Sequence, residues 1–359
     1  MTAAAHRRRG RRVTLRAGGH GRAPELSARL DLRVLAVLAG ASAGLLAAFV
    51  VGVGHGDFPI PPAEVLATLV GQGTAEHEFI VLELRLPRVL VAILVGAAFA
   101  LSGAIFQSLA QNPLVAPDII GVNAGAALVA VSVIVLGFPL GLLAPGAFLG
   151  ALGAAVLVYA LSYRRGLSTY RLVLVGIAVN AAIGAGISYL LTRGEINDVQ
   201  RATVWLIGSV YASDWGDVRL LGLALLALVP AAVALGRHLE ALQLGDDVAR
   251  AIGAPVERAR LALVVVGVAL AALAVAVAGP IGFVAFIAPH IARRLAGTSG
   301  AGALPTSIAI GALLVLAADI IAQRALAPTA LPVGIVTTLL GAPYFLYLLQ
   351  RANRLGRAV

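Results

Sequence analysis

The stretch "LRLPRVLVAILVGAAFALSGAIFQSLAQNPLVAP", residues 84–117, determines which class of fold this chain can adopt. No charged side chain interrupts it after Arg88, and the apolar run that follows exceeds the ~20 residues with which an α-helix crosses a bilayer. Similar apolar runs recur along the chain and are separated by short polar loops. The sequence therefore predicts an all-α polytopic membrane protein, because a β-barrel would show short segments of alternating polarity instead.

The composition supports this class. The chain has 359 residues, of which 60% are hydrophobic and 12% charged, whereas soluble domains carry about a quarter charged residues. Cysteine is absent, which excludes disulfides and thiolate metal sites, and every basic residue is an arginine, which excludes a P-loop or Schiff-base lysine. We expect no catalytic, cofactor or metal site in this chain. If ATP powers the protein, a partner chain must bind ATP and Mg²⁺ and hydrolyse the nucleotide.

Three regions are predicted. Residues 1–32 contain "RRRGRRVTLR" and no apolar core, so we expect a disordered cytoplasmic tail, followed by a transmembrane domain over 33–352 and a cytoplasmic tail over 353–359. Gly279-Pro280 must separate the seventh span from the eighth because proline breaks a helix. The ten expected spans are 33–53, 87–108, 121–137, 143–162, 171–192, 218–236, 260–279, 280–296, 305–323 and 333–351.

The distribution of arginine predicts the orientation. If the N-terminus lies in the cytoplasm, 21 of the 27 arginines fall on cytoplasmic segments and 6 on outer ones. Both termini are therefore expected in the cytoplasm, and the net charge of +10 reflects topology, not nucleic-acid binding. The longest outer loop, about 54–86, contains "PIPPAEVLATLVGQG", which predicts a short helix that begins at a proline and lies on the outer surface.

A polar stretch, "QLGDDVARAIGAPVERAR" at 243–260, lies on the cytoplasmic side between the sixth and seventh spans. Acidic residues followed by a glycine stop predict a short helix over "DDVARAIG", and "PVERAR" begins the next turn. Asp319 is the one acid inside a predicted span, and either water or Arg324 could satisfy it if its role is structural. His290 has no second histidine at ligand spacing, so we expect it to pack or form a hydrogen bond, not to bind metal or haem.

Four stretches together resemble the FecCD family of permeases, the membrane subunits of ABC importers for iron-siderophores, haem and vitamin B12. They lie at 84–128, 166–180, 244–297 and 331–351, and the resemblance covers roughly residues 55–352. "LGDD…RAIG" and "VWLIGSVYASDW" are most similar to ferric-enterobactin permease subunits. The resemblance implies ten helices in the cytoplasmic (inner) membrane, a second permease subunit that is identical or paralogous, cytoplasmic ATPase subunits and an extracytoplasmic binding protein.

The resemblance also implies roles for particular residues. Outward arginines of the family meet glutamates of the binding protein, and the matching residues here are Arg85, Arg88 and Arg324; alternatively, the first two anchor in lipid headgroups. The loops that narrow the inner end of the pathway would place Asn112, Leu114, Ser168 and Thr169 at a cytoplasmic gate, although Asn-Pro and Ala-Pro also favour simple turns.

The polar stretch at 243–260 would form coupling helices that insert into a cleft on the ATPase; the alternative is a solvated loop. The residues that match are Gly245, Asp246, Ala249, Arg250 and Gly253. Ala249 and Gly253 are small and four apart, so we expect one face of this helix to approach another protein closely, with Arg250 available for a carboxylate on the ATPase.

The expected function is that of a permease subunit that translocates ferric siderophore and performs no chemistry on it. Haem or cobalamin import is the alternative within the family. A self-powered secondary transporter is the alternative from another class, but it would need several paired intramembrane acids or bases, and the spans offer Asp319 alone. The sequence does not indicate which siderophore is carried.

Overall fold

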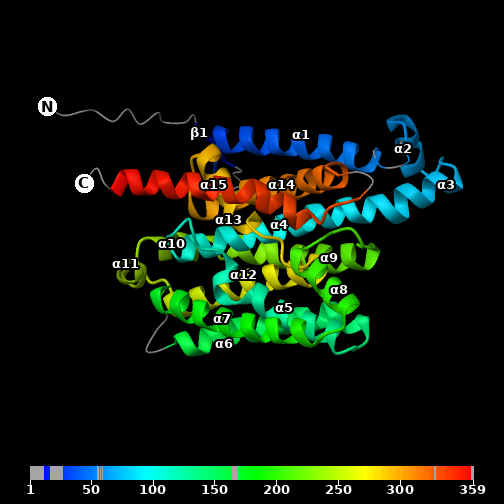
Figure 1. The fold of residues 1–359 in the computed structure, drawn as a ribbon. Coiled ribbons are helices and arrows are strands. Elements are labelled where there is room, and N and C mark those ends of the chain that lie inside the picture. Colours follow the sequence, from blue (N-terminus) through cyan, green and yellow to red (C-terminus); the bar gives the residue numbers. More distant parts are fainter. Residues whose placement is uncertain are drawn as a thin grey trace.

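A computed structural model describes residues 12–16, 27–54, 56, 58, 60–163, 169–326 and 329–356, and it is a bundle of long, roughly parallel helices (Figure 1). Each of the ten predicted segments contains a helix, which confirms the fold class. These helices are α1 (Leu32–Gly54), α4 (Leu86–Leu109), α5 (Val122–Val135), α6 (Leu143–Ser162), α7 (Thr169–Arg193), α9 (Trp215–Ala234), α12 (Val256–Ala278), α13 (Val284–Ala296), α14 (Leu304–Arg324) and α15 (Val333–Gly356).

Two of the predicted spans are shorter than expected. Among the described residues, 8 helices are long and apolar enough to cross a membrane, whereas α5 has 14 residues and α13 has 13. At 1.5 Å per residue these two reach only about 20 Å, less than the ~30 Å hydrocarbon core. The backbone explains both cases. Phe283 (φ 66°) adopts a left-handed conformation that delays the start of α13, whereas α5 lies between two glycines with left-handed conformations, Gly121 (φ 84°) and Gly137 (φ 70°).

Short elements connect the long helices. They are α2 (Pro62–Leu69), α3 (Ala75–Glu78), the π-helix η1 (Phe79–Arg85), the 3₁₀-helices η2 (Pro117–Ile120), η3 (Leu140–Leu142) and η4 (Gly300–Ala303), α8 (Ile196–Ile207), α10 (Gly236–Gln243) and α11 (Asp246–Ala251). Helices α2 and α11 confirm the two short helices predicted from proline and glycine signals, whereas α8 and α10 were not predicted. Figure 1 shows α2 and α3 at one end of the bundle and α10 and α11 at the opposite end.

The N-terminal segment differs from the expected disordered tail in its described part. Strand β1 (Arg12–Arg16) pairs antiparallel with β2 (Ser27–Asp31), with Val13 opposite Leu30 and Leu15 opposite Ala28. Apolar residues alternate with polar ones in both segments, which is the pattern of a strand. A lone two-stranded hairpin is marginally stable in water, so these strands do not by themselves make a folded domain. The division of the chain into a tail and a transmembrane domain stays a prediction.

Helix α4 occupies the centre of the bundle. It packs against α14, α12, α13 and α9. In its most apolar stretch 83% of the residues are buried, compared with 6% in the corresponding stretch of the peripheral helix α1. A Cβ atom at Gly103 would lie 1.7 Å from the carbonyl oxygen of Ala285, and one at Gly96 would lie 2.2 Å from that of Gly311. The backbones of α4, α13 and α14 therefore touch directly, as small residues allow in membrane helices.

We expect Gly103→Ala to destabilise the protein, because its methyl group would overlap a backbone carbonyl that cannot rotate away. The cost should reach or exceed the upper part of the about 1–3 kcal/mol typical of overpacking. Gly40→Ala in α1 is the matched control, since nothing lies within 4 Å of its Cβ position. Thermal unfolding of both variants in detergent measures the difference, and equal midpoints would contradict this account of the core.

Candidate functional site

The first charged cluster lies where α4 begins. Arg88 donates from Nε to Asp319 Oδ2 at 3.0 Å and from Nη2 to Asp319 Oδ1 at 2.8 Å, and Gln323 Nε2 donates to the same carboxylate at 2.8 Å. The Asp319 side chain is 1% exposed and that of Arg88 is 12% exposed. This bidentate geometry pairs both carboxylate oxygens with guanidinium N–H groups, which a single hydrogen bond would not do. The expectation that water or Arg324 satisfies Asp319 is therefore wrong; α14 packs along α4 and brings Arg88 to it.

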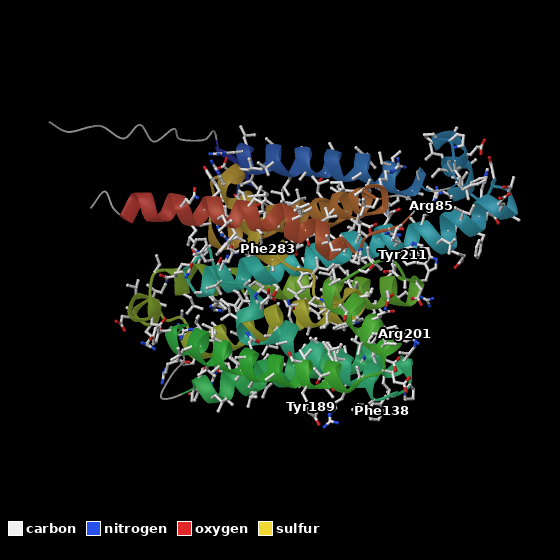
Figure 2. The ribbon with its side chains drawn as sticks, in the orientation of Figure 1. Arg85, Phe138, Tyr189, Arg201, Tyr211 and Phe283 are labelled. Atoms are coloured by element: carbon white, nitrogen blue, oxygen red, sulfur yellow. The ribbon has the colours of Figure 1, made fainter. Side chains whose placement is uncertain are left out.

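The three predicted docking arginines have different surroundings. Arg85 is half-buried and donates to the backbone carbonyl of Val53 at 3.0 Å and to that of Phe58, so it holds the segment after α1. Arg88 points into the bundle, where its guanidinium also lies 5.1 Å from the ring centre of Tyr211. Arg324, at the end of α14, is exposed. A pocket of about 540 Å³ lies beside Arg85, Arg88 and Tyr211, and Figure 2 shows Arg85 and Tyr211 at this end.

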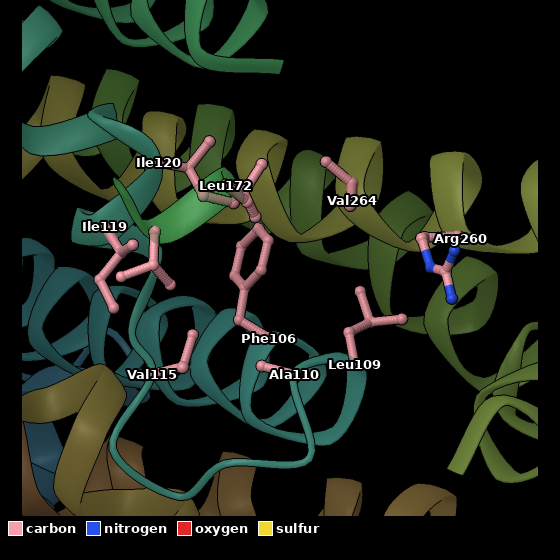
Figure 3. A pocket seen from close by; sticks show the side chains of 10 residues that line it. Phe106, Leu109, Ala110, Val115, Ile119, Ile120, Leu172, Arg260 and Val264 are labelled. Carbon is pink, nitrogen blue, oxygen red and sulfur yellow. The ribbon is translucent and has the colours of Figure 1, made fainter. Parts of the chain in front are cut away.

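The predicted gate lies at the other end of α4. Asn112 Oδ1 accepts a hydrogen bond from the backbone nitrogen of Leu114 at 2.9 Å, which makes the loop a side-chain-stabilised turn. Thr169 is the first residue of α7, with its side chain outside the described atoms, and Ser168 lies outside the described residues. Val115, in the Asn112 loop, and Leu172, in the first turn of α7, line one small cavity of about 40 Å³ (Figure 3). The structure thus brings the two predicted gate segments together.

Helix α7 is fixed against the η2 turn by a polar contact that the sequence analysis missed. Asn180 Nδ2 donates to the backbone oxygen of Asp118 at 3.0 Å, and a Cβ at Gly176 would lie 1.8 Å from the carbonyl oxygen of Ile119. Desolvation raises the pKa of the Asp118 carboxyl to about 6, although a hydrogen bond with Asn123 acts in the opposite direction. Polar residues within the apolar stretch "APDIIGVN" were the signal that could have revealed this contact.

The predicted coupling segment, 243–260, begins at the last residue of α10, contains α11 and ends within the first residues of the long helix α12; α10 and α11 together form a helical hairpin. Gly245 (φ 95°) and Gly253 (φ 82°) adopt left-handed conformations on either side of α11, which suits glycine at both turns. Ala249 is 0% exposed and packs in the core of this chain. The expectation that Ala249 faces another protein is therefore wrong. Leu244, Val248 and Ile252, spaced four apart, are instead exposed by 61%, 48% and 62%.

Salt bridges within the chain hold this segment. Arg260 Nη2 lies 2.5 Å from Asp246 Oδ1, and the Arg260 side chain is 16% exposed. Arg250 lies 3.4–3.8 Å from three carboxylates of its own chain, those of Asp246, Asp247 and Glu257. Arg250 was expected to pair with a carboxylate on another protein, but the structure gives it partners on either side of the turn. Exposed pairs of this kind contribute little stability individually.

His290 has the packing environment that the sequence suggested. Its ring centre lies 5.8 Å from that of Tyr344, in an edge-to-face arrangement. Within the described part of the chain, no group of three or more His, Cys, Asp or Glu side chains could hold a metal ion.

These features define the class: a multi-pass helical membrane protein with a tightly packed central helix and a helical hairpin at one end. The model of the FecCD transport family matches residues 44–351, and the chain belongs to that family. It is therefore a membrane permease subunit of the ABC transporter type.

Curated relatives and a solved structure agree with this assignment. The chain is 41% identical to the probable siderophore transport system permease protein YfhA of Bacillus subtilis, over 89% of this chain and 95% of the relative. It is also 41% identical to the ferric enterobactin transport system permease protein FepG of Escherichia coli, over 84% of this chain and 92% of the relative. An inward-facing metal-chelate type ABC transporter superposes with a TM-score of 0.79 at 30% identity, covering 88% of this chain and 99% of that one.

The pairing of Arg88 with Asp319 yields a test that separates structure from docking. Arg88→Met and Asp319→Leu should each destabilise the protein by about 3–5 kcal/mol, because each leaves one buried charge without its partner. The double variant should recover most of that loss, since it removes both charges. Thermal unfolding of the four proteins gives the coupling energy, with Arg324→Met as the exposed control. If Arg88→Met unfolds at the wild-type temperature, the pair is not a structural element.

Proposed function

We propose that this chain is the membrane-spanning permease subunit of an ABC importer that carries ferric siderophores into the cytoplasm. The observation that carries the proposal is the match of residues 44–351 to the FecCD family together with siderophore-permease relatives at 41% identity. The chain performs no chemistry on the substrate in this proposal. A separate ATPase subunit binds ATP and Mg²⁺, a second permease subunit completes the pathway, and an extracytoplasmic binding protein delivers the substrate.

The orientation is part of the proposal. Both termini and the α10–α11 hairpin are placed in the cytoplasm, and α2 and α3 on the outer side. The arginine distribution supports this orientation. In Figure 1 the start of α1 lies at the same end of the bundle as α10 and α11, which supports placing the N-terminus and the hairpin on the same side of the membrane. A hydrogen bond fixes the start of α1 there, since Arg33 Nε donates to the carbonyl oxygen of Leu295, in the last turn of α13, at 2.6 Å.

We assign the ATPase contact to the exposed apolar side chains of the hairpin, namely Leu244, Val248 and Ile252, because a solvated loop gains nothing from exposing them. The five residues predicted for coupling then have supporting roles. Gly245 and Gly253 form the turns, Ala249 packs the helix on the bundle, and Asp246 and Arg250 set its orientation through salt bridges.

Binding-protein docking is proposed for the outer end of α4 and α14. Arg324 is exposed there and can meet a carboxylate directly, and Arg85 shapes the neighbouring loop. Arg88 contributes by holding α4 to α14 beneath that surface. The gate is proposed where the Asn112–Leu114 turn meets the start of α7 at Thr169; Ser168, the other residue predicted there, lies outside the described residues.

The substrate class is tested by transport. Proteoliposomes that contain the chain, its ATPase and second permease, with the binding protein supplied, should accumulate ⁵⁵Fe-labelled ferric catecholate siderophore when ATP is present. Haem and cobalamin serve as competing substrates in parallel vesicles. Uptake of haem or cobalamin without uptake of any ferric siderophore would overturn the substrate proposal. Siderophore uptake without the ATPase would overturn the ABC mechanism.

The ATPase contact predicts the effect of a single charge. Val248→Glu should weaken ATPase association at least tenfold, the effect of about 1.4 kcal/mol, because a carboxylate would be desolvated in an apolar cleft. Asp247→Ala is the neighbouring control, since the Asp247 side chain is fully exposed. Co-purification of the ATPase with each detergent-extracted variant measures the difference. Equal recovery with Val248→Glu and with the control would show that the ATPase binds another part of the chain.

A further inference from the structure

Gln111 links the α10–α11 hairpin, which is the proposed ATPase contact, to the Asn112–Leu114 turn, which is the proposed gate. Its side-chain nitrogen Nε2 donates to the carbonyl oxygen of Leu242 at 3.2 Å and to that of Gln243 at 3.1 Å. Both acceptors are at the C-terminal end of α10, directly before α11. Gln111 itself immediately precedes Asn112, whose side chain forms the gate turn. One side chain therefore connects the ATPase-facing hairpin to the gate loop.

The backbone of Gln111 is strained in a way that fits this role. Its φ of 50° is in the left-handed region, and among the described residues only one other non-glycine residue, Phe283, has a positive φ. A glutamine in this conformation costs free energy that a glycine would not. The side chain that glutamine has and glycine lacks is the donor to Leu242 and Gln243.

Gln107, one turn earlier, anchors α4 beside this link. It is 3% exposed, donates to the carbonyl oxygens of Ala285 and Phe286 at 3.3 and 3.0 Å, and accepts a hydrogen bond from Arg293. Below this anchor a cavity of about 400 Å³ is lined by Gln111, Asn112 and Gln243. The end of α4 is thus rigid at Gln107, while open space around Gln111 leaves the gate turn room to move.

A second contact leads from the hairpin to the same gate loop. Asp246, at the start of α11, pairs with Arg260 of α12, and Arg260 lines the small cavity that Val115 also lines. Figure 3 shows Arg260 and Val115 on the border of that cavity. This contact passes through α12, whereas the Gln111 contact reaches the gate turn directly.

We propose that Gln111 is the positioning residue that transmits movement of the α10–α11 hairpin to the gate turn at Asn112–Leu114. The inference rests on the proposed function. When the ATPase displaces the hairpin, the carbonyl groups of Leu242 and Gln243 move, and Gln111 carries the first residue of the gate turn with them. Loss of the donor should leave the ATPase cycle intact and separate it from the gate.

The test follows the gate directly in the assembled complex. The chain has no cysteine, so Leu114→Cys introduces its single thiol and leaves the Asn112 hydrogen bond to the residue-114 backbone in place. The rate of labelling by a maleimide is measured with and without nucleotide trapped on the ATPase. Gln111→Glu is isosteric but directs a carboxylate at two carbonyl oxygens, Gln111→Gly relieves the backbone strain without a donor, and Gln111→Lys restores a nitrogen donor.

The expected result is a nucleotide-dependent labelling change that falls by about 2- to 30-fold in Gln111→Glu and Gln111→Gly, the range for a residue that couples two sites. ATPase activity stimulated by the binding protein should persist in both, and Gln111→Lys should retain the labelling change. Gln72→Glu, an exposed glutamine after α2, is the matched control. A purely structural role would lower ATPase stimulation and labelling together.

An undiminished labelling change in Gln111→Glu or Gln111→Gly would overturn the proposal, as would its loss in Gln111→Lys, because then the donor is not what matters. Failure of the proposed function has a different signature. In that case the wild-type complex would show no ATP-dependent uptake of siderophore, whereas the labelling assay requires only the ATPase and nucleotide.

Discussion

Direct contact between helix backbones is the constraint on which this structure depends. Lipid tails are as apolar as leucine side chains, so the hydrophobic effect does not hold membrane helices together, and close packing must do so. Gly96 and Gly103 of α4 meet backbone atoms of α14 and α13 with no space for a methyl group. This contact makes α4 a rigid axis. The Arg88–Asp319 ion pair near its start and the proposed gate turn at its end are both positioned by it.

The charges of the bundle follow from the same constraint. A carboxylate inside an apolar bundle is costly unless a cation and further donors surround it, and Asp319 receives donors from both Arg88 and Gln323. The contact of Arg88 with Asp319 therefore joins α4 and α14 near the end of the bundle that carries α2 and α3. This ion pair gives a stable base to the surface proposed to receive a binding protein, and the exposed Arg324 extends from the end of α14.

The opposite end of the bundle is built differently. Beyond the buried anchor at Gln107, the hairpin is joined to the bundle by hydrogen bonds from Gln111 to the end of α10 and by a partly exposed salt bridge from Arg260 to Asp246. Contacts of this kind break and re-form at low cost, and the cavity beside Gln111 leaves space for movement. Rigid packing at the centre and weaker polar contacts at one end suit the proposed role, in which the subunit transmits displacement without losing its fold.

The sequence by itself determined the class of fold, the position of every long helix and the family. It could do so because apolar runs, prolines and glycines act locally: Pro62 starts α2, and Gly253 follows α11. It did not determine which faces meet. The partner of Asp319 lies 231 positions away at Arg88, α11 turns Ala249 inward and leaves Val248 exposed, and Gln111 reaches a carbonyl 131 positions along the chain. Only the tertiary structure decides such pairings, because they depend on how helices rotate and pack against one another, and a nearly uniform apolar sequence carries little signal for that rotation.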